Sequence, residues 1–275
     1  MQEVEPTLGR VIFITSFKGG VGKTTVTANL AGALIYLNKR VLVIDGDFGM
    51  RCMDIVLGFE DYAVFDLYDV ISGKCDIDSA IIYSETNPLL SFLPAPMNDD
   101  FNSEDQIERI PTQFEFTKLI SSLRDKYDFI LIDSAANINE LYISFAKTAD
   151  DAIIVSLHQA SSIRAAERTA TALSEMGFEN LRLVVNCFRA NDAAKNRLPG
   201  VVDMINRTTV RLLGIIPYDD NLPPDQEIGR IAYDRNTKKR SKYELAVFNI
   251  ASRICKNNVP LFNNIYASNK KIKMF

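Results

Sequence analysis

The chain has 275 residues, of which 47% are hydrophobic and 24% are charged, as in an ordinary globular protein. Its formal net charge of −4 excludes a global positive field, so binding to nucleic acid or to an anionic membrane would need a local basic patch. The four cysteines, at positions 52, 75, 187 and 255, lack the spacing of a zinc or iron–sulfur site. We expect neither a signal peptide nor a membrane-spanning helix.

Short apolar runs alternate with helical patterns along the chain. The run VIFITS (11–16) reaches a glycine-rich segment, and residues 24–37 carry apolar side chains at helical spacing. Further apolar runs lie at 40–45, 89–96, 127–133, 151–157, 181–186 and 212–217. Because most of these runs are apolar throughout, they are typical of strands that are covered on both faces. The order predicts an α/β fold with a mostly parallel twisted sheet and helices on both faces.

Two later helices complete the expected organisation. Residues 161–176 form a helical pattern, with serines that we expect to cap its start and Gly177 at its end. The last helix is expected over 241–257. Because no linker divides the chain, we predict one domain over 1–257, followed by a tail over 258–275.

The segment FKGGVGKTT (17–25) nearly matches the phosphate-binding pattern G-x-x-x-x-G-K-[ST], with Phe17 at the place of the first glycine. Glycines let the backbone turn tightly, so that successive N–H groups point at phosphate oxygens. A lysine in this pattern reaches the β- and γ-phosphates, and the hydroxyl that follows it binds Mg²⁺. The predicted nucleotide-binding residues are Gly19, Gly20, Val21, Gly22, Lys23, Thr24 and Thr25. The alternative, a glycine-rich turn without a ligand, is less favoured because the segment follows a predicted strand and opens a predicted helix.

Three aspartates end two of the predicted strands. Asp133 closes the run FILID, the Walker B pattern of a magnesium-side carboxylate. Asp45 and Asp47 lie in VIDGDFG, after the second strand. We assign Thr24, Asp133 and Asp45 to magnesium and Asp47 to the attacking water. The alternative for Asp133 is a turn-forming residue at a strand end.

A second lysine, Lys18, lies inside the loop, and the stretch KGGVGKTT resembles the deviant Walker A motif of the ParA/MinD ATPases. In that family the early lysine acts across a nucleotide-sandwich dimer. The resemblance therefore implies an ATP-dependent homodimer in which Lys18 joins Lys23 and Asp47 as a catalytic residue, acting on the partner's nucleotide. The alternative is a solvated surface charge.

The resemblance covers about 10–255. The stretch 41–60 resembles the MinD form of switch I and lacks the D-x-D-P-Q-x-N sequence of ParA proteins. LVVNCFR (183–189) resembles a family segment that implies contact between Asn186 and the adenine base. YDFILIDSAAN (127–137) is similar to switch II, but Ala135 and Asn137 stand where proline and glycine are usual.

The resemblance implies a MinD-like switch that hydrolyses Mg·ATP to ADP and phosphate, slowly and under stimulation by a partner. It also implies Min-type protein partners, a role in placing the cell division site, and a cytoplasmic protein that is peripheral on the inner face of the membrane when ATP-bound. Three alternatives stay open: a ParA-like partition ATPase that binds DNA through 230–242, a regulator of flagellar number, and a scaffold that has lost catalysis. The unusual residues Ala135 and Asn137 suggest the last of these.

Two basic segments are candidates for contact with a target surface. The tail NVPLFNNIYASNKKIKMF (258–275) can form an amphipathic membrane-targeting helix with apolar side chains on one face and lysines near the lipid. It can also be a polar tail that folds back on the domain. The segment RNTKKRSK (235–242) is either a contact for lipid, DNA or protein, or a solvated loop.

Overall fold

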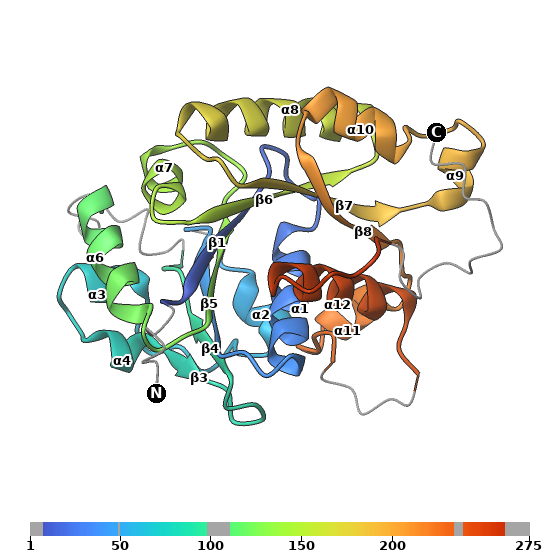
Figure 1. The fold of residues 1–275 in the computed structure, drawn as a ribbon. Helices are drawn as coiled ribbons and strands as arrows, with labels where there is room; N and C mark the ends of the chain where they lie inside the picture. The colour runs from blue at the N-terminus through green and yellow to red at the C-terminus, as the bar shows by residue number, and fades with distance from the viewer. Residues whose placement is uncertain (1–7, 49, 98–110, 234–238, 262–275) are drawn as a thin grey trace, which may run out of the picture.

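The computed structural model describes residues 8–48, 50–97, 111–233 and 239–261 (Figure 1). One eight-stranded sheet runs through these residues in the order β3-β4-β2-β5-β1-β6-β7-β8. All strand pairs are parallel except β3–β4. The strands are β1 (Arg10–Thr15), β2 (Val41–Gly46), β3 (Ile82–Tyr83), β4 (Leu90–Leu93), β5 (Phe129–Ser134), β6 (Asp151–Leu157), β7 (Leu181–Phe188) and β8 (Arg211–Pro217).

Helices cover both faces of this sheet (Figure 1). On one face lie α1 (Lys23–Tyr36), α2 (Met53–Leu57), α11 (Leu222–Gln226) and α12 (Lys242–Ile254). On the other lie α3 (Leu67–Ile71), α4 (Ile77–Ala80), α6 (Gln113–Leu123), α7 (Glu140–Ala146), α8 (Ala160–Glu175), α9 (Ala190–Ala194) and α10 (Val201–Thr208).

The alternation of side chains along the strands divides the interior into two apolar layers. In β1, Ile12 and Ile14 pack toward α1 and α12, whereas Val11 and Phe13 pack toward α6, α7 and α8. Successive side chains of a strand point to opposite faces. Both layers are built from side chains that are almost fully buried, which confirms the expectation of strands covered on both sides. The predicted α/β fold is confirmed.

The predicted strands lie within one or two residues of the observed ones, apart from the prolines at 94 and 96, which lie beyond the end of β4. Strand β3 was missed, since two residues are too few to show a period. The last helix ends at Ile254, earlier than predicted. The stretch 190–200 begins with the short helix α9. Half of the basic segment 235–242 and most of the tail 258–275 lie outside the described residues.

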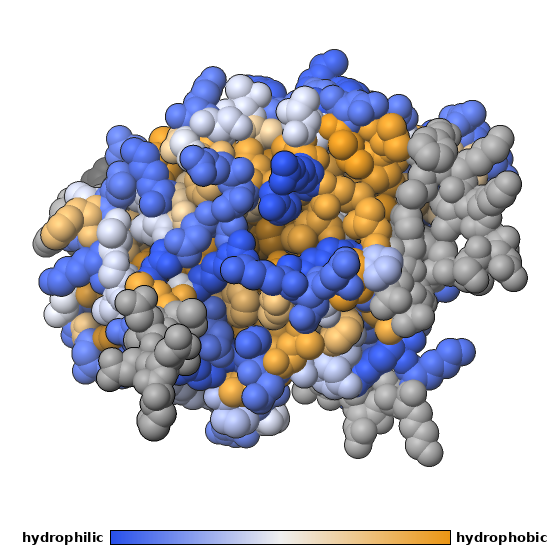
Figure 2. All heavy atoms as spheres, in the orientation of Figure 1, coloured by the Kyte–Doolittle hydropathy of each residue, from blue (hydrophilic) through white to orange (hydrophobic). Residues whose placement is uncertain are grey.

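Within the described part of the chain, no helix is both long and apolar enough to cross a membrane. The face drawn in Figure 2 is mostly hydrophilic, and its apolar atoms gather where Figure 1 draws α10, β7 and β8.

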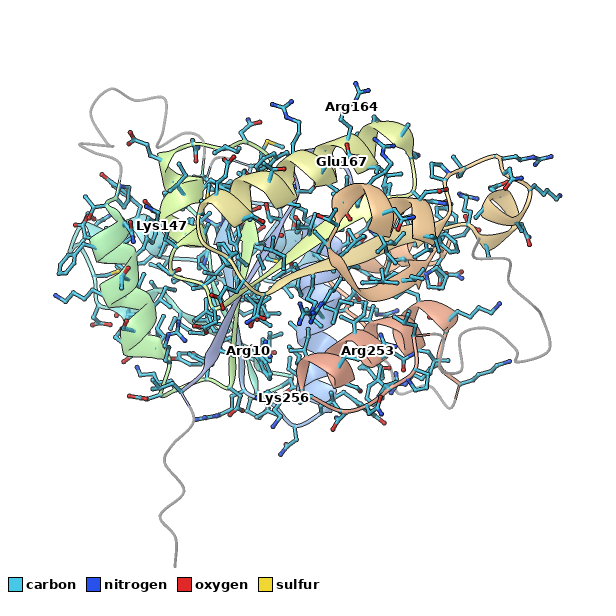
Figure 3. All side chains as sticks on the ribbon, turned by 45° about the horizontal axis from the view of Figure 1, so that its top comes forward. Arg10, Lys147, Arg164, Glu167, Arg253 and Lys256 are labelled. Carbon is cyan, nitrogen blue, oxygen red and sulfur yellow. The ribbon has the colours of Figure 1, made fainter. Side chains whose placement is uncertain are left out.

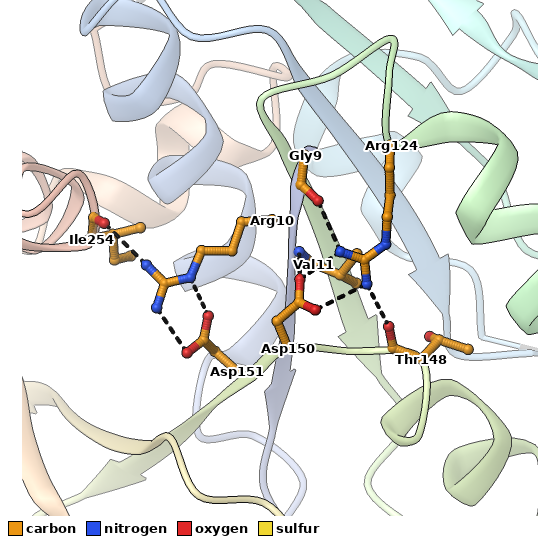
Figure 4. A network of polar contacts seen from close by, with 8 residues as sticks. All are labelled: Gly9, Arg10, Val11, Arg124, Thr148, Asp150, Asp151 and Ile254. Atoms are coloured by element: carbon orange, nitrogen blue, oxygen red, sulfur yellow. Dashed lines mark hydrogen bonds and ion pairs between the residues drawn. The ribbon is translucent and has the colours of Figure 1, made fainter. Parts of the chain in front are cut away.

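Ion pairs join the segments that enter the sheet at its amino edge (Figure 4). Asp150 accepts hydrogen bonds from Arg124 at 2.7 and 3.0 Å and from the Val11 backbone N–H at 2.8 Å. Arg124 also donates to the carbonyl oxygens of Gly9 (3.0 Å) and Thr148 (3.2 Å). This carboxylate therefore fixes the end of α6, the start of β1 and the loop before β6 to one another.

We predict that Asp150→Ala lowers the free energy of unfolding by about 1–2 kcal/mol, because one backbone N–H and the guanidinium lose their acceptor together. Urea unfolding at pH 7 measures the change. The matched control is Asp125→Ala, which removes an exposed carboxylate and should shift stability by less than about 0.5 kcal/mol. Equal effects of the two substitutions would contradict the assignment.

Candidate functional site

The phosphate loop joins the end of β1 at Thr15 to the start of α1 at Lys23. Gly20 and Gly22 have φ angles of 71° and 85°, a left-handed conformation that favours glycine. Gly22 is the N-cap of α1, and no side chain caps this helix start. The first N–H groups of α1 therefore depend on a ligand or water for partners, and the positive end of the helix favours an anion there.

Asn186, near the end of β7, holds this loop through its side-chain amide. Its Nδ2 donates a hydrogen bond to the carbonyl oxygen of Val21 at 2.9 Å, and its Oδ1 accepts one from the Cys187 backbone N–H at 2.9 Å. A Cβ atom at Gly22 would lie 2.5 Å from Nδ2. The buried amide thus holds the loop against the sheet, and the predicted contact between Asn186 and a base stays a prediction.

Two carboxylates lie side by side next to the loop. Asp45 in β2 and Asp133 in β5 occupy the same register of neighbouring strands, and each is only 1% exposed. The Thr24 hydroxyl donates to Asp133 Oδ2 at 2.6 Å. Thr27 Oγ1 lies 3.0 Å from Asp133 Oδ1. The structure therefore brings together Thr24, Asp133 and Asp45, the three residues assigned to magnesium.

The acidity of this site is shifted by burial. Burial raises the pKa of Asp133 to about 6, against the opposing effects of the Thr24 hydrogen bond and the Lys23 charge. Burial and then the Asp133 charge raise the pKa of Asp45 well above its usual value. Burial also raises the pKa of Asp47, which Lys23 partly offsets. A divalent cation would remove the cost of holding these carboxylates together.

The side chains of the two loop lysines, Lys18 and Lys23, interact with different groups. Lys23 is almost buried, and its charge acts on Asp47 and Asp133. Lys18 Nζ donates to Ser161 Oγ at 2.9 Å and to Ser162 Oγ at 3.0 Å, in the first turn of α8. Within one chain, Lys18 is therefore held away from the carboxylates.

The expectation that serines cap α8 is wrong. The N-cap of α8 is Gln159, which makes no side-chain capping hydrogen bond. Ser161 and Ser162 lie inside the helix, and their hydroxyl groups accept from Lys18 instead. Because serine is common at helix starts, the sequence alone could not distinguish a cap from a partner of a distant lysine.

Three further residues contact the loop or α1 and were missed. Thr27 lies one turn after Thr24, so helical spacing could have placed it near Asp133. Gln226 donates from Nε2 to Thr25 Oγ1 at 2.9 Å, and Thr169 accepts from the Phe17 backbone N–H at 3.2 Å. Neither has a local signal, because both contacts join segments that lie far apart in the sequence.

We predict that Asp133→Asn stabilises the metal-free protein at pH 8. A folded-state pKa near 6 exceeds the ordinary value of about 3.9, so ionising Asp133 costs stability as the pH rises through this interval. The free energy of unfolding of the variant should exceed that of the natural chain by roughly 1–3 kcal/mol at pH 8, and by about half of that at pH 5. Urea unfolding in the presence of a chelator measures both differences.

The control for this prediction is Asp61→Asn, at an exposed carboxylate, which should change stability little at either pH. A variant Asp133→Asn that is less stable than the natural chain at pH 8 contradicts the prediction.

Comparisons with known proteins agree with this geometry. The family model described as an AAA domain matches residues 9–180. The septum site-determining protein MinD of Synechocystis is 36% identical over 262 residues, which cover 95% of each chain. MinD of Bacillus subtilis is 34% identical over 257 residues, covering 92% of each chain.

Solved structures show the same fold. The MinC:MinD cell division protein complex of Aquifex aeolicus contains a chain that matches with a TM-score of 0.82 and 31% identity, over 92% of this chain and 98% of that one. MinD of Pyrococcus horikoshii, solved with Mg-ADP, matches with a TM-score of 0.76 and 29% identity, over 90% of this chain and 97% of that one. By sequence and by fold, the chain belongs to the MinD family of P-loop ATPases.

Proposed function

We propose that this protein is an ATP-dependent switch of MinD type, which hydrolyses Mg·ATP, dimerises with ATP at the interface and takes part in placing the cell division site. One observation carries the proposal: a phosphate loop with lysines at 18 and 23 adjoins a buried pair of carboxylates, one of which, Asp133, accepts a hydrogen bond from Thr24. The related proteins are named for determination of the septum site, and one was solved with Mg-ADP.

The described residues fit a nucleotide and a magnesium ion. The uncapped start of α1 and the glycine turn present backbone N–H groups to an anion. The Thr24 hydroxyl, Asp133 and Asp45 offer oxygen atoms, which are the ligands that Mg²⁺ prefers. When bound, magnesium supplies positive charge that offsets the negative charge of the phosphates.

Each group of the site then has a role in hydrolysis. Lys23 and the N–H groups of residues 19–25 bind the phosphate oxygens. Asp133 and Thr24 position each other through their hydrogen bond and hold the metal together with Asp45. Asp47, whose raised pKa makes it a better proton acceptor than an ordinary aspartate, orients the attacking water.

Lys18 acts on the nucleotide of a second copy. In one chain its ammonium group is hydrogen-bonded to Ser161 and Ser162, so it contributes nothing to its own carboxylate pair. In a face-to-face dimer it stabilises charge at the partner's γ-phosphate, as an arginine finger does. We also propose a protein partner of the Min type, on the basis of the MinC:MinD complex that the chain resembles.

The target surface is the membrane in this proposal. Residues 1–257 form the ATPase domain, and residues 258–275 form an amphipathic segment that anchors the ATP-bound dimer. The protein is then cytoplasmic and peripheral on the inner face of the cell membrane. DNA is the competing surface, through the basic segment 235–242.

We predict that Lys18→Ala changes nucleotide affinity by less than about threefold but lowers the hydrolysis rate by at least about 100-fold. The same substitution should abolish the ATP-dependent dimer in light scattering. Lys118→Ala, which removes an exposed lysine of α6, is the matched control and should leave both properties unchanged. Full ATPase activity in Lys18→Ala would refute the role in trans.

A mixture of Lys18→Ala and Asp47→Ala chains tests the same point by complementation. A mixed dimer contains one complete site, with Asp47 from one chain and Lys18 from the other. An equal mixture should recover up to about a quarter of the natural rate, provided that mixed dimers form as readily as natural ones. Recovery of activity in the mixture contradicts any mechanism in which Lys18 acts only within its own chain.

We predict that a chain truncated after residue 257 hydrolyses ATP at its basal rate but no longer co-sediments with vesicles of acidic phospholipid. The full chain should sediment with ATP and remain in solution with ADP. ATP-dependent retention on duplex DNA that falls with salt, without binding to vesicles, would favour the competing surface.

A further inference from the structure

Positive side chains gather at the edge of the sheet opposite the phosphate loop. The parallel strands begin at this edge, and α12 ends there. Five residues make up this group, which we call the amino-edge patch: Lys39, Arg182, Arg211, Arg253 and Lys256. The whole chain carries a net charge of −4, so a positive edge is a local departure from the overall balance.

Contacts connect several members of the amino-edge patch to one another or to the same elements. Arg182 and Arg211 are neighbours across the first register pair of β7 and β8. Arg253 Nη1 donates to the carbonyl oxygen of Leu213, two residues further along β8, at 2.8 Å. Lys39, before β2, lies close enough to Cys255 that its charge lowers the pKa of this thiol, against the larger opposite effect of burial.

Arg10 completes the connection, because it lies at the start of β1 and donates to the carbonyl oxygen of Ile254 at 3.2 Å. Figure 3 shows Arg10, Arg253 and Lys256 together, away from Arg164 and Glu167 of α8. Five strand spacings separate β2 from β8, so the patch extends over about 24 Å.

The carboxylates of this edge neutralise other cations. Asp151 pairs with Arg10, Asp128 with Arg40, and Asp150 with Arg124. Among the described residues, no carboxylate forms an ion pair with any of the five patch members. Glu175 and Glu179 line the same groove as Arg182 and Arg211 without pairing with either.

Helix electrostatics account for only part of the patch. Arg253 lies in the last turn of α12, where a cation interacts favourably with the helix dipole. Lys39 and Arg211 each lie two residues past the C-cap of a helix, α1 and α10 respectively, where the same interaction favours a cation. Arg182 and Arg211 carry like charges directly opposite each other, an arrangement that costs stability.

The last described residues of the chain contact this patch. Arg253 Nε donates to the carbonyl oxygen of Val259 at 2.8 Å, and its Nη2 donates to that of Pro260. The first residues of the tail are therefore fixed beside Leu213 and the start of β8.

We infer that the amino-edge patch contacts the acidic headgroups of the membrane to which the tail binds. The inference rests on the proposed membrane binding and adds a second contact, made by the folded domain itself. The charge complements phosphatidylserine-type lipids, and the contact fixes which edge of the domain faces the membrane. Cations next to an anionic bilayer each strengthen binding and lose their effect as salt rises.

The test compares Lys39→Gln/Lys256→Gln with the control Lys118→Gln/Arg168→Gln, in the full chain with Mg·ATP. Both doubles remove two positive charges, and the control pair lies on the outer surfaces of α6 and α8. The measurement is co-sedimentation with vesicles that contain phosphatidylcholine with or without phosphatidylserine, at low and high salt. The patch double should bind phosphatidylserine vesicles roughly tenfold more weakly, with a shallower salt dependence and an unchanged basal ATPase rate. The control double should bind like the natural chain.

Each outcome decides one question. Equal binding by the patch double and the natural chain, combined with loss of binding after truncation at 257, overturns the inference and leaves the proposed function intact. Failure of the natural chain to bind either vesicle overturns both. A patch double that binds vesicles normally but loses salt-sensitive retention on duplex DNA assigns the patch to nucleic acid and also overturns the inference.

Discussion

The architecture of the site depends on the position of Asp133 beside Asp45, in the interior, at the ends of two parallel strands. The pair is held by the register of β2 and β5 and by the hydroxyl groups of α1, so the strands, the loop and the first helix meet at one carboxylate. In the absence of a cation the arrangement is unfavourable, as the raised pKa of each carboxyl group indicates. The site thus lowers the stability of the ligand-free fold, and bound ligands can restore it. The main packing lies in the two apolar layers that cover the sheet.

Much of the fold and of the site could be predicted from sequence because the relevant signals are local. Uninterrupted apolar runs indicated the parallel strands, and the loop from Gly19 to Thr24 carries its own chemistry. Long-range contacts could not be predicted. The side-chain amide of Asn186 supports the carbonyl group of Val21 from 165 residues away, and the serines of α8 bind Lys18 instead of capping their helix. Strand β3 was missed because two residues depend on their neighbour β4 and show no pattern of their own.

The hydrogen bonds of Lys18 to Ser161 and Ser162 give its ammonium group a defined position in the single chain. The ammonium group of a loop lysine could remain solvated, but here two hydroxyl groups hold it at the start of α8. In the proposed dimer, Lys18 exchanges these hydrogen bonds for contacts with the partner's phosphate. The start of α8 thereby becomes a place where a bound protein can alter the availability of the lysine without touching the nucleotide.

The parallel sheet gives the molecule a direction, because all strands except β3 send their carboxyl ends to the phosphate loop and their amino ends to the positive edge. A strand of six residues separates the two edges by about 20 Å, so the phosphate loop and the positive edge do not contact each other. Under the proposed function, nucleotide binding therefore acts on the target surface through the number of copies held together. In the proposed dimer, two linked copies bind one surface with an avidity that exceeds the affinity of a single copy. A switch of this kind needs no large shape change within the domain.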